Sequence, residues 1–165
     1  MKRVFFDIDG TLNVWETGVP IEEVTSPGYL VAREPHKNIV EAARLLYEAG
    51  VDVFIISAVF DLPHSIPEKD QWIDKYLPFI DKAHRLYPLC GEGKSEALKH
   101  AGFKDGDVLL DDYNVNLREV RVGLGNKVKC VKCVCPGTND TRGTWDGDRV
   151  FVTEDPENIA MKLKA

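Results

Sequence analysis

Two carboxylates and a glycine follow the first apolar run of the chain. Asp7 and Asp9 come directly after residues 4–6, and Gly10 follows them. Buried parallel strands are nearly continuous apolar runs, and ligands of α/β proteins bind where such strands end. In an extended chain residues 7 and 9 share one face, so their carboxylates would repel unless a cation lies between them or one binds a proton. This stretch therefore predicts a metal site or a proton-transfer role.

Further polar groups occupy comparable positions later in the chain. Ser57 follows an apolar run at 51–56, and Asp111 and Asp112 follow another run. Lys94 stands at the start of a predicted helix, where a cation opposes the helix dipole and is expected to face an anion. Because the carboxyl ends of parallel strands meet at one edge of a sheet, these distant segments are expected to converge there.

Each of these signals also has a purely structural interpretation. A serine after a strand is commonly a turn residue, and Asp112 would serve as the N-cap of the next helix. The residues around Lys94 are similar to a P-loop, but that motif needs a glycine where Pro88 stands. The stretch that begins at Asp7 is not a calcium loop, because such a loop needs a third ligand and a glycine at its sixth position, whereas Gly10 comes fourth. The expected convergence of all these residues at one edge of the sheet, more than any single residue, argues for an active site.

Strands and helices are expected to alternate between these residues. The predicted strands are 4–6, 51–56, 84–87, 108–110, 127–135 and 149–152. The predicted helices are 35–50, 65–82, 91–101, 114–122 and 156–163. This order predicts an α/β fold with a doubly wound, mostly parallel, Rossmann-like sheet. The stretch 12–34 is rich in Gly and Pro, so we expect a flap, a minimal cap insertion, rather than a long helix.

The composition predicts one domain over residues 1–165. With 44% apolar and 29% charged residues, a chain of 165 residues buries a core without disulfides. The net charge of -6 argues against a nucleic-acid duplex or an anionic membrane as partner, although basic residues outnumber acidic ones between Arg118 and Arg149. No apolar run is long enough for a membrane span or a signal peptide, so a cytoplasmic location is expected.

Three of the four cysteines, Cys130, Cys133 and Cys135, lie close together, whereas Cys90 stands alone. A zinc site needs two separated ligand pairs, and on a strand Cys130 faces away from the other two. We expect reduced, partly buried strand cysteines, and a metal or redox role is the alternative.

Taken together, the motifs resemble the haloacid dehalogenase superfamily of phosphohydrolases, and within it the 5'(3')-deoxyribonucleotidase-like branch. The four motifs in question are residues 7–11, residues 55–57, Lys94 and residues 110–112. Their order and spacing agree with the superfamily. Residues 111–117 and the Gly-Thr-Trp run at 143–145 are similar to bacterial and phage members of the branch.

This resemblance implies a phosphomonoesterase that uses Mg²⁺ and an aspartyl-phosphate intermediate. Asp7 would be the nucleophile, and Asp9 would protonate the leaving oxygen and then activate the hydrolytic water. The Asp7 carboxylate, the Asp9 backbone carbonyl and Asp112 would hold Mg²⁺. The resemblance also implies that Ser57, the Ala58 amide and Lys94 bind the phosphate. Residues expected to support the site are Gly10, Thr11, Asp111 and Asn116.

The expected substrate is a small phosphorylated molecule, most simply a (deoxy)nucleoside monophosphate. Trp15 and Tyr29 of the flap are able to stack on a base or sugar. A sugar phosphate or another small phosphoester is the alternative substrate. A phosphoryl-accepting signalling domain is a rival from another class, but such domains carry the accepting Asp on the third strand, which here ends at Tyr87 and Pro88. The complete set of catalytic residue types argues against an idle binding protein.

Overall fold

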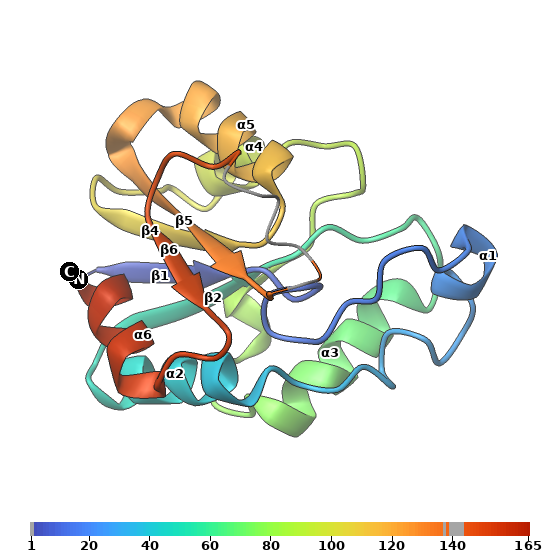
Figure 1. Cartoon of the computed structure of the whole chain (residues 1–165). Helices are drawn as coiled ribbons and strands as arrows, with labels where there is room; N and C mark the ends of the chain where they lie inside the picture. Colours follow the sequence, from blue (N-terminus) through green and yellow to red (C-terminus); the bar gives the residue numbers. More distant parts are fainter. Residues whose placement is uncertain (1, 137, 139–143) are drawn as a thin grey trace.

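The computed structural model describes residues 2–136, 138 and 144–165. In this part of the chain six strands form one sheet in the order β3-β2-β1-β4-β5-β6, and every pair is parallel (Figure 1). The strands are β1 (Arg3–Phe6), β2 (Asp52–Ile56), β3 (Arg85–Leu86), β4 (Asp107–Asp111), β5 (Val128–Val134) and β6 (Arg149–Phe151). The strand order reverses at β1, which pairs with β2 and β4, so the binding edge of the sheet lies beside β1. The predicted α/β fold with a doubly wound parallel sheet is confirmed.

Helices cover both faces of this sheet (Figure 1). One face carries α2 (Lys37–Glu48), α3 (Ser65–Tyr76) and α6 (Pro156–Lys164), and the other carries α4 (Lys94–His100) and α5 (Asn114–Leu124). Val4 and Phe6 of β1 pack into the first layer, whereas Phe5 packs into the second, which explains the unbroken apolar run. None of the helices in the described ranges is long and apolar enough to cross a membrane.

The structure corrects the predicted helix at 65–82. Helix α3 ends at Tyr76, and the chain then runs through Leu77 and Pro78 to a short 3-10 turn at Lys82–His84. Proline disfavours the helical region for the residue before it, so Leu77 leaves the helix. The following strand, β3, is correspondingly shorter than predicted.

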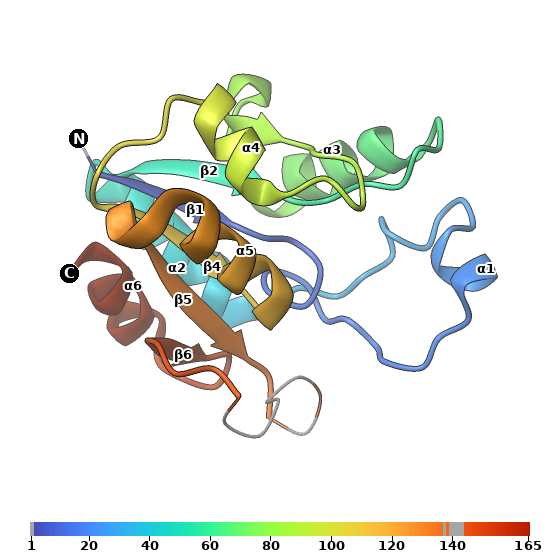
Figure 2. The same ribbon diagram turned by 90° about the horizontal axis from the view of Figure 1, so that it is seen from above.

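The flap, residues 12–34, leaves the sheet after β1 and returns before α2. Its base is closed by two backbone hydrogen bonds, from Val14 N to Glu34 O and from His36 N to Leu12 O. Its only helix among the described residues is the single turn α1 (Ile21–Val24). Figure 2 shows the flap extending beyond the end of the sheet. It has a small apolar core of its own, made of Val24, Tyr29 and Leu30 with Trp15, Val19 and Phe60 against it.

None of the four cysteines, all of which lie in the described ranges, forms a disulfide. Cys130 and Cys133 are buried on β5 and belong to the cores on opposite faces of the sheet, as a strand spacing of three requires. Burial raises the pKa of both thiols, which opposes thiolate chemistry. The two residues serve the core.

Candidate active site

Three charged side chains from distant parts of the chain meet at the carboxyl edge of the sheet. Asp7 follows β1, Asp111 ends β4, and Lys94 begins α4. The Lys94 Nζ donates to Asp7 Oδ1 at 2.7 Å and to Asp111 Oδ2 at 2.5 Å. All three residues are buried. The predicted anion opposite Lys94 is therefore this pair of carboxylates.

Burial sets the protonation of this cluster. Desolvation raises the pKa of the Asp7 carboxyl to about 6, because the attraction of Lys94 does not offset desolvation together with the charge of Asp111. Desolvation acts on Lys94 too, but the carboxylates of Asp111 and Asp7 outweigh it and raise the pKa of the ammonium. Asp111 also accepts from the Tyr113 amide at 2.8 Å and from Asn116 Nδ2 at 3.1 Å. Asn116 thus contacts Asp111 directly, and its supporting role stays a prediction.

Asp7, Asp111 and Asp112 form a set of possible cation ligands. One carboxylate oxygen from each lies within 4.8 Å of the others. Oxygen donors of this kind suit a hard cation such as Mg²⁺. Among the described residues, the three carboxylates outnumber the two ammonium groups that contact these residues from α4 and β5, which leaves a local excess of negative charge. Gly10 makes room for this arrangement: its φ is +84°, and a Cβ there would lie 2.3 Å from Asp112 Oδ2. The donor chemistry of these residues therefore fits a divalent cation.

Asp9 lies outside this set, because its carboxylate has other partners. Its Oδ1 accepts from Asn13 Nδ2 at 3.1 Å, and its Oδ2 accepts from Lys69 Nζ at 2.6 Å. Asn13 also accepts from the Gly10 amide, which fixes the turn after β1. The two carboxylates of the first motif are thus each neutralised by a different lysine, rather than by one cation between them.

Lys69 is a site residue that the sequence reasoning missed. It is 2% exposed, and its Nζ donates to Ser57 Oγ at 2.7 Å and to the Ala58 carbonyl at 2.8 Å as well as to Asp9. The buried stripe of α3 runs along positions 65, 68, 69, 72 and 73. Lys69 lies three and four residues before the apolar Trp72 and Ile73, and this spacing on the buried face was the signal that pointed to a buried partner.

The flap brings Trp15 close to the carboxylates. Trp15, Gly10 and Asp112 line a cavity of about 30 Å³. The ring of Trp15 meets that of Tyr29 edge-on, with centroids 5.9 Å apart, and the Arg33 guanidinium lies over Tyr29 at 4.2 Å. Tyr29 is 8% exposed, so in this conformation its ring belongs to the core of the flap. That these two residues contact substrate stays a prediction.

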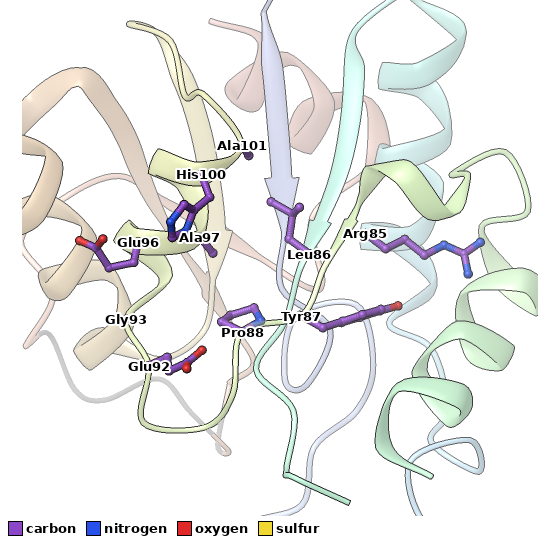
Figure 3. A pocket seen from close by; sticks show the side chains of 10 residues that line it. All are labelled: Arg85, Leu86, Tyr87, Pro88, Glu92, Gly93, Glu96, Ala97, His100 and Ala101. Carbon is purple, nitrogen blue, oxygen red and sulfur yellow. The ribbon is translucent and has the colours of Figure 1, made fainter. Parts of the chain in front are cut away.

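A separate pocket of about 680 Å³ lies between β3 and α4 (Figure 3). Leu86 and Pro88 line one side, and Ala97 and His100 of α4 line the other. Arg85 turns the opposite way, toward α3, where it pairs with Asp70 and Asp74. None of the residues predicted to form the active site lines this pocket, so its volume does not locate the chemistry.

The Gly-Thr-Trp run at 143–145 is described only in part, because Gly143 lies outside the described residues. Asn114 Nδ2, at the start of α5, donates to Thr144 Oγ1. Trp145 is buried, and the Arg121 guanidinium of α5 lies 4.1 Å from the centre of its ring. Residues 144 and 145 therefore pack against the helix that follows Asp112.

The sequence relatives found among known proteins share one name. No family model matches the chain. A Staphylococcus aureus protein named "Putative 5'(3')-deoxyribonucleotidase" is 27% identical over 111 residues, which make up 67% of this chain and 54% of that protein. A protein of the same name from Staphylococcus epidermidis is 26% identical over 111 residues. The chain spans about half the length of these curated relatives.

Solved structures decide the fold family. A D,D-heptose 1,7-bisphosphate phosphatase from B. bronchiseptica, complexed with magnesium and phosphate, has a TM-score of 0.67 at 16% identity, with 99% of this chain and 98% of that chain covered. A haloacid dehalogenase family hydrolase from Deinococcus radiodurans, with bound phosphate and sodium, has a TM-score of 0.65 at 15% identity and covers 99% of this chain and 95% of its own. The chain has the haloacid dehalogenase fold. The predicted fold is thus confirmed, and the curated sequence relatives carry the name of the branch that the motifs resemble.

Proposed function

We propose that this protein is a Mg²⁺-dependent phosphomonoesterase that acts on (deoxy)nucleoside monophosphates through an aspartyl-phosphate. One observation carries the proposal: the buried Asp7 shares the ammonium of Lys94 with Asp111 and belongs with Asp112 to one set of possible cation ligands. Asp9, two residues after Asp7, is paired with a different lysine. The haloacid dehalogenase fold and the names of the sequence relatives support it.

In the first step Asp7 attacks the phosphorus of the substrate. A bond forms between the Asp7 carboxylate oxygen and phosphorus, and the bond from phosphorus to the leaving oxygen breaks. Asp9 donates a proton to that oxygen, since an alkoxide is a poor leaving group near neutral pH. Lys94 holds Asp7 in place and balances the charge that the phosphoryl group brings.

In the second step water releases the phosphate. Asp9, now ionised, accepts a proton from the water that attacks the phosphorus, and the Asp7 carboxylate is restored. Lys69 holds the Asp9 carboxylate in place, because its Nζ donates to Asp9 Oδ2 at 2.6 Å. The same ammonium donates to Ser57 Oγ and to the Ala58 carbonyl, so it links Asp9 to the two residues that are proposed to bind the phosphate.

The divalent cation would be held by Asp7 and Asp112, with Asp111 alongside. The backbone carbonyl of Asp9 is a further proposed ligand. When bound, Mg²⁺ would neutralise negative charge on the phosphate oxygens and on the carboxylates. The chain itself positions the nucleophile and moves the proton.

Replacing Asp9 by Asn is expected to separate substrates by their leaving group. The amide cannot donate a proton to an alkoxide, so hydrolysis of an alkyl phosphate should slow much more than that of p-nitrophenyl phosphate, whose leaving group needs little protonation. Steady-state kcat on the two substrates measures this difference. Equal slowing on both would speak against Asp9 as the acid.

Mg²⁺ binding is expected to depend on pH through Asp7. The pKa of Asp7 is raised to about 6 without metal, so below pH 6 the cation must displace one proton, whereas above it the carboxylate is already ionised. The affinity should therefore weaken by about tenfold per pH unit below pH 6 and level off above it. Isothermal titration in buffers of different ionisation enthalpy counts the released proton. An unchanged pH profile in Asp7→Asn would show that another group titrates.

A substrate screen tests the whole proposal. Nucleoside monophosphates, sugar phosphates and other small phosphoesters are assayed for phosphate release with Mg²⁺ and with excess chelator. We expect several deoxynucleoside monophosphates to be hydrolysed, with modest discrimination among bases, and the release to stop with chelator. Sugar phosphates are the second candidate class, because the closed core of the flap leaves Tyr29 buried. Activity restricted to sugar phosphates would select them instead.

A further inference from the structure

Three side chains at a spacing of four residues hold the flap against α3. These side chains are His64, at the N-cap of α3, and Glu68 and Trp72 within the helix. They lie along one side of α3, because residues four apart are neighbours on a helical surface. Their partners are all main-chain groups of the flap, at Thr25, at Gly28 and Leu30, and at Arg33. The flap is therefore fastened to α3 by its backbone, independently of its side chains.

Glu68, the middle residue of the three, accepts two hydrogen bonds from the flap. Its two carboxylate oxygens accept the Gly28 amide at 2.6 Å and the Leu30 amide at 3.2 Å. Glu68 is 8% exposed, so these bonds are shielded from water, and bonds to an ionised acceptor are stronger than neutral ones. The two amides flank Tyr29 on either side. The carboxylate thus fixes the backbone of the residue on which Trp15 rests.

The next residue along the helix, Lys69, contacts the proposed active site. Lys69 donates hydrogen bonds to Asp9 and to Ser57. Two consecutive residues of α3 therefore contact different parts of the molecule: Glu68 bonds the flap, and Lys69 bonds the proposed acid. Trp15, at the other end of the flap core, lines the small cavity beside Asp112. The position of the flap relative to the carboxylates is therefore set through α3.

We propose that Glu68 is a positioning residue that holds the flap over the site and thereby sets the affinity for the part of the substrate beyond the phosphate. This inference rests on the proposed function. Without the carboxylate, the amides of Gly28 and Leu30 lose their acceptor, and the flap must be ordered each time such a substrate binds. A substrate that occupies only the phosphate site does not meet this cost.

The first measurement is amide hydrogen exchange at Gly28 and Leu30 in the whole chain. Glu68→Ala is expected to speed exchange at both amides by about tenfold or more, because two acceptors are lost. Glu68→Gln keeps one accepting oxygen and should have a smaller effect. Glu157→Gln is the matched control, since it removes an exposed glutamate from the first turn of another helix, α6. Amides of α2 should be unaffected in all three variants.

The second measurement compares two substrates. In Glu68→Ala the KM for a deoxynucleoside monophosphate should rise by about tenfold with kcat changed less than about twofold, whereas both constants for acetyl phosphate stay near the wild-type values. Glu68→Gln should fall between Glu68→Ala and the wild type. Thermal denaturation checks that each variant is folded.

Two outcomes overturn the inference. Unchanged exchange at Gly28 and Leu30 in Glu68→Ala would show that the carboxylate does not hold the flap. An equal loss on both substrates would show that Glu68 acts through Lys69 or through the fold. If the wild type hydrolyses no phosphoester, the proposed function falls, and calorimetric affinity for the same nucleotide then replaces KM in comparing the variants.

Discussion

Replacing Asp7 by Asn should abolish turnover, with kcat lower by roughly 10⁴-fold or more, because the amide is a poor nucleophile and no aspartyl-phosphate can form. The fold should persist. Asn is nearly isosteric, and Lys94 keeps its bond to Asp111. Burial already disfavours the ionised Asp7 carboxylate, so its removal relieves a desolvation cost.

Trapping the aspartyl-phosphate intermediate tests directly whether Asp7 is the residue that becomes phosphorylated. Acid quenching during turnover of a substrate with labelled phosphate should leave label on the wild-type protein and none on Asp7→Asn. Asp61→Asn, at an exposed position, is the control for loss of a carboxylate elsewhere. Retention of more than about one hundredth of the wild-type kcat in Asp7→Asn would exclude Asp7 as the nucleophile.

Replacing Lys94 by Met should lower the free energy of unfolding by about 3 to 5 kcal/mol at pH 7, because removing one partner of a buried ion pair leaves uncompensated charge. Two buried carboxylates, Asp7 and Asp111, lose the ammonium that bridges them. Urea denaturation measures the loss. Turnover should fall as well, since we propose that Lys94 balances the charge of the phosphoryl group.

The pH dependence identifies the cause of this destabilisation. Without Lys94 the folded-state pKa of Asp7 rises further, and a carboxyl with a raised folded pKa stabilises the protein at low pH and loses that contribution as pH rises. The deficit of Lys94→Met should therefore be smaller at pH 5 than at pH 7. Lys99→Met, on the exposed side of the same helix, should stay within about 0.5 kcal/mol of the wild type. An equal deficit at both pH values would indicate lost packing instead.

The sequence by itself determined the fold class and the meeting of Asp7, Lys94 and Asp111. Apolar runs such as residues 4–6 identify buried parallel strands, because only a strand covered on both faces is apolar at successive positions. Parallel strands then place their carboxyl ends at one edge, so residues that follow different strands converge whatever the details of packing. Local chemistry was less reliable where proline intervened, as at the end of α3 before Pro78.

Only the tertiary structure decided which lysine meets which carboxylate. Lys69 lies 60 residues from Asp9 in sequence, and no local pattern fixes the rotation of α3 that brings the two side chains together. The same rotation turns Glu68 toward the flap. These contacts depend on how α3 packs against the sheet and the flap at once. Such packing is a property of the whole core, because each side chain finds its partner only after distant segments have taken their places.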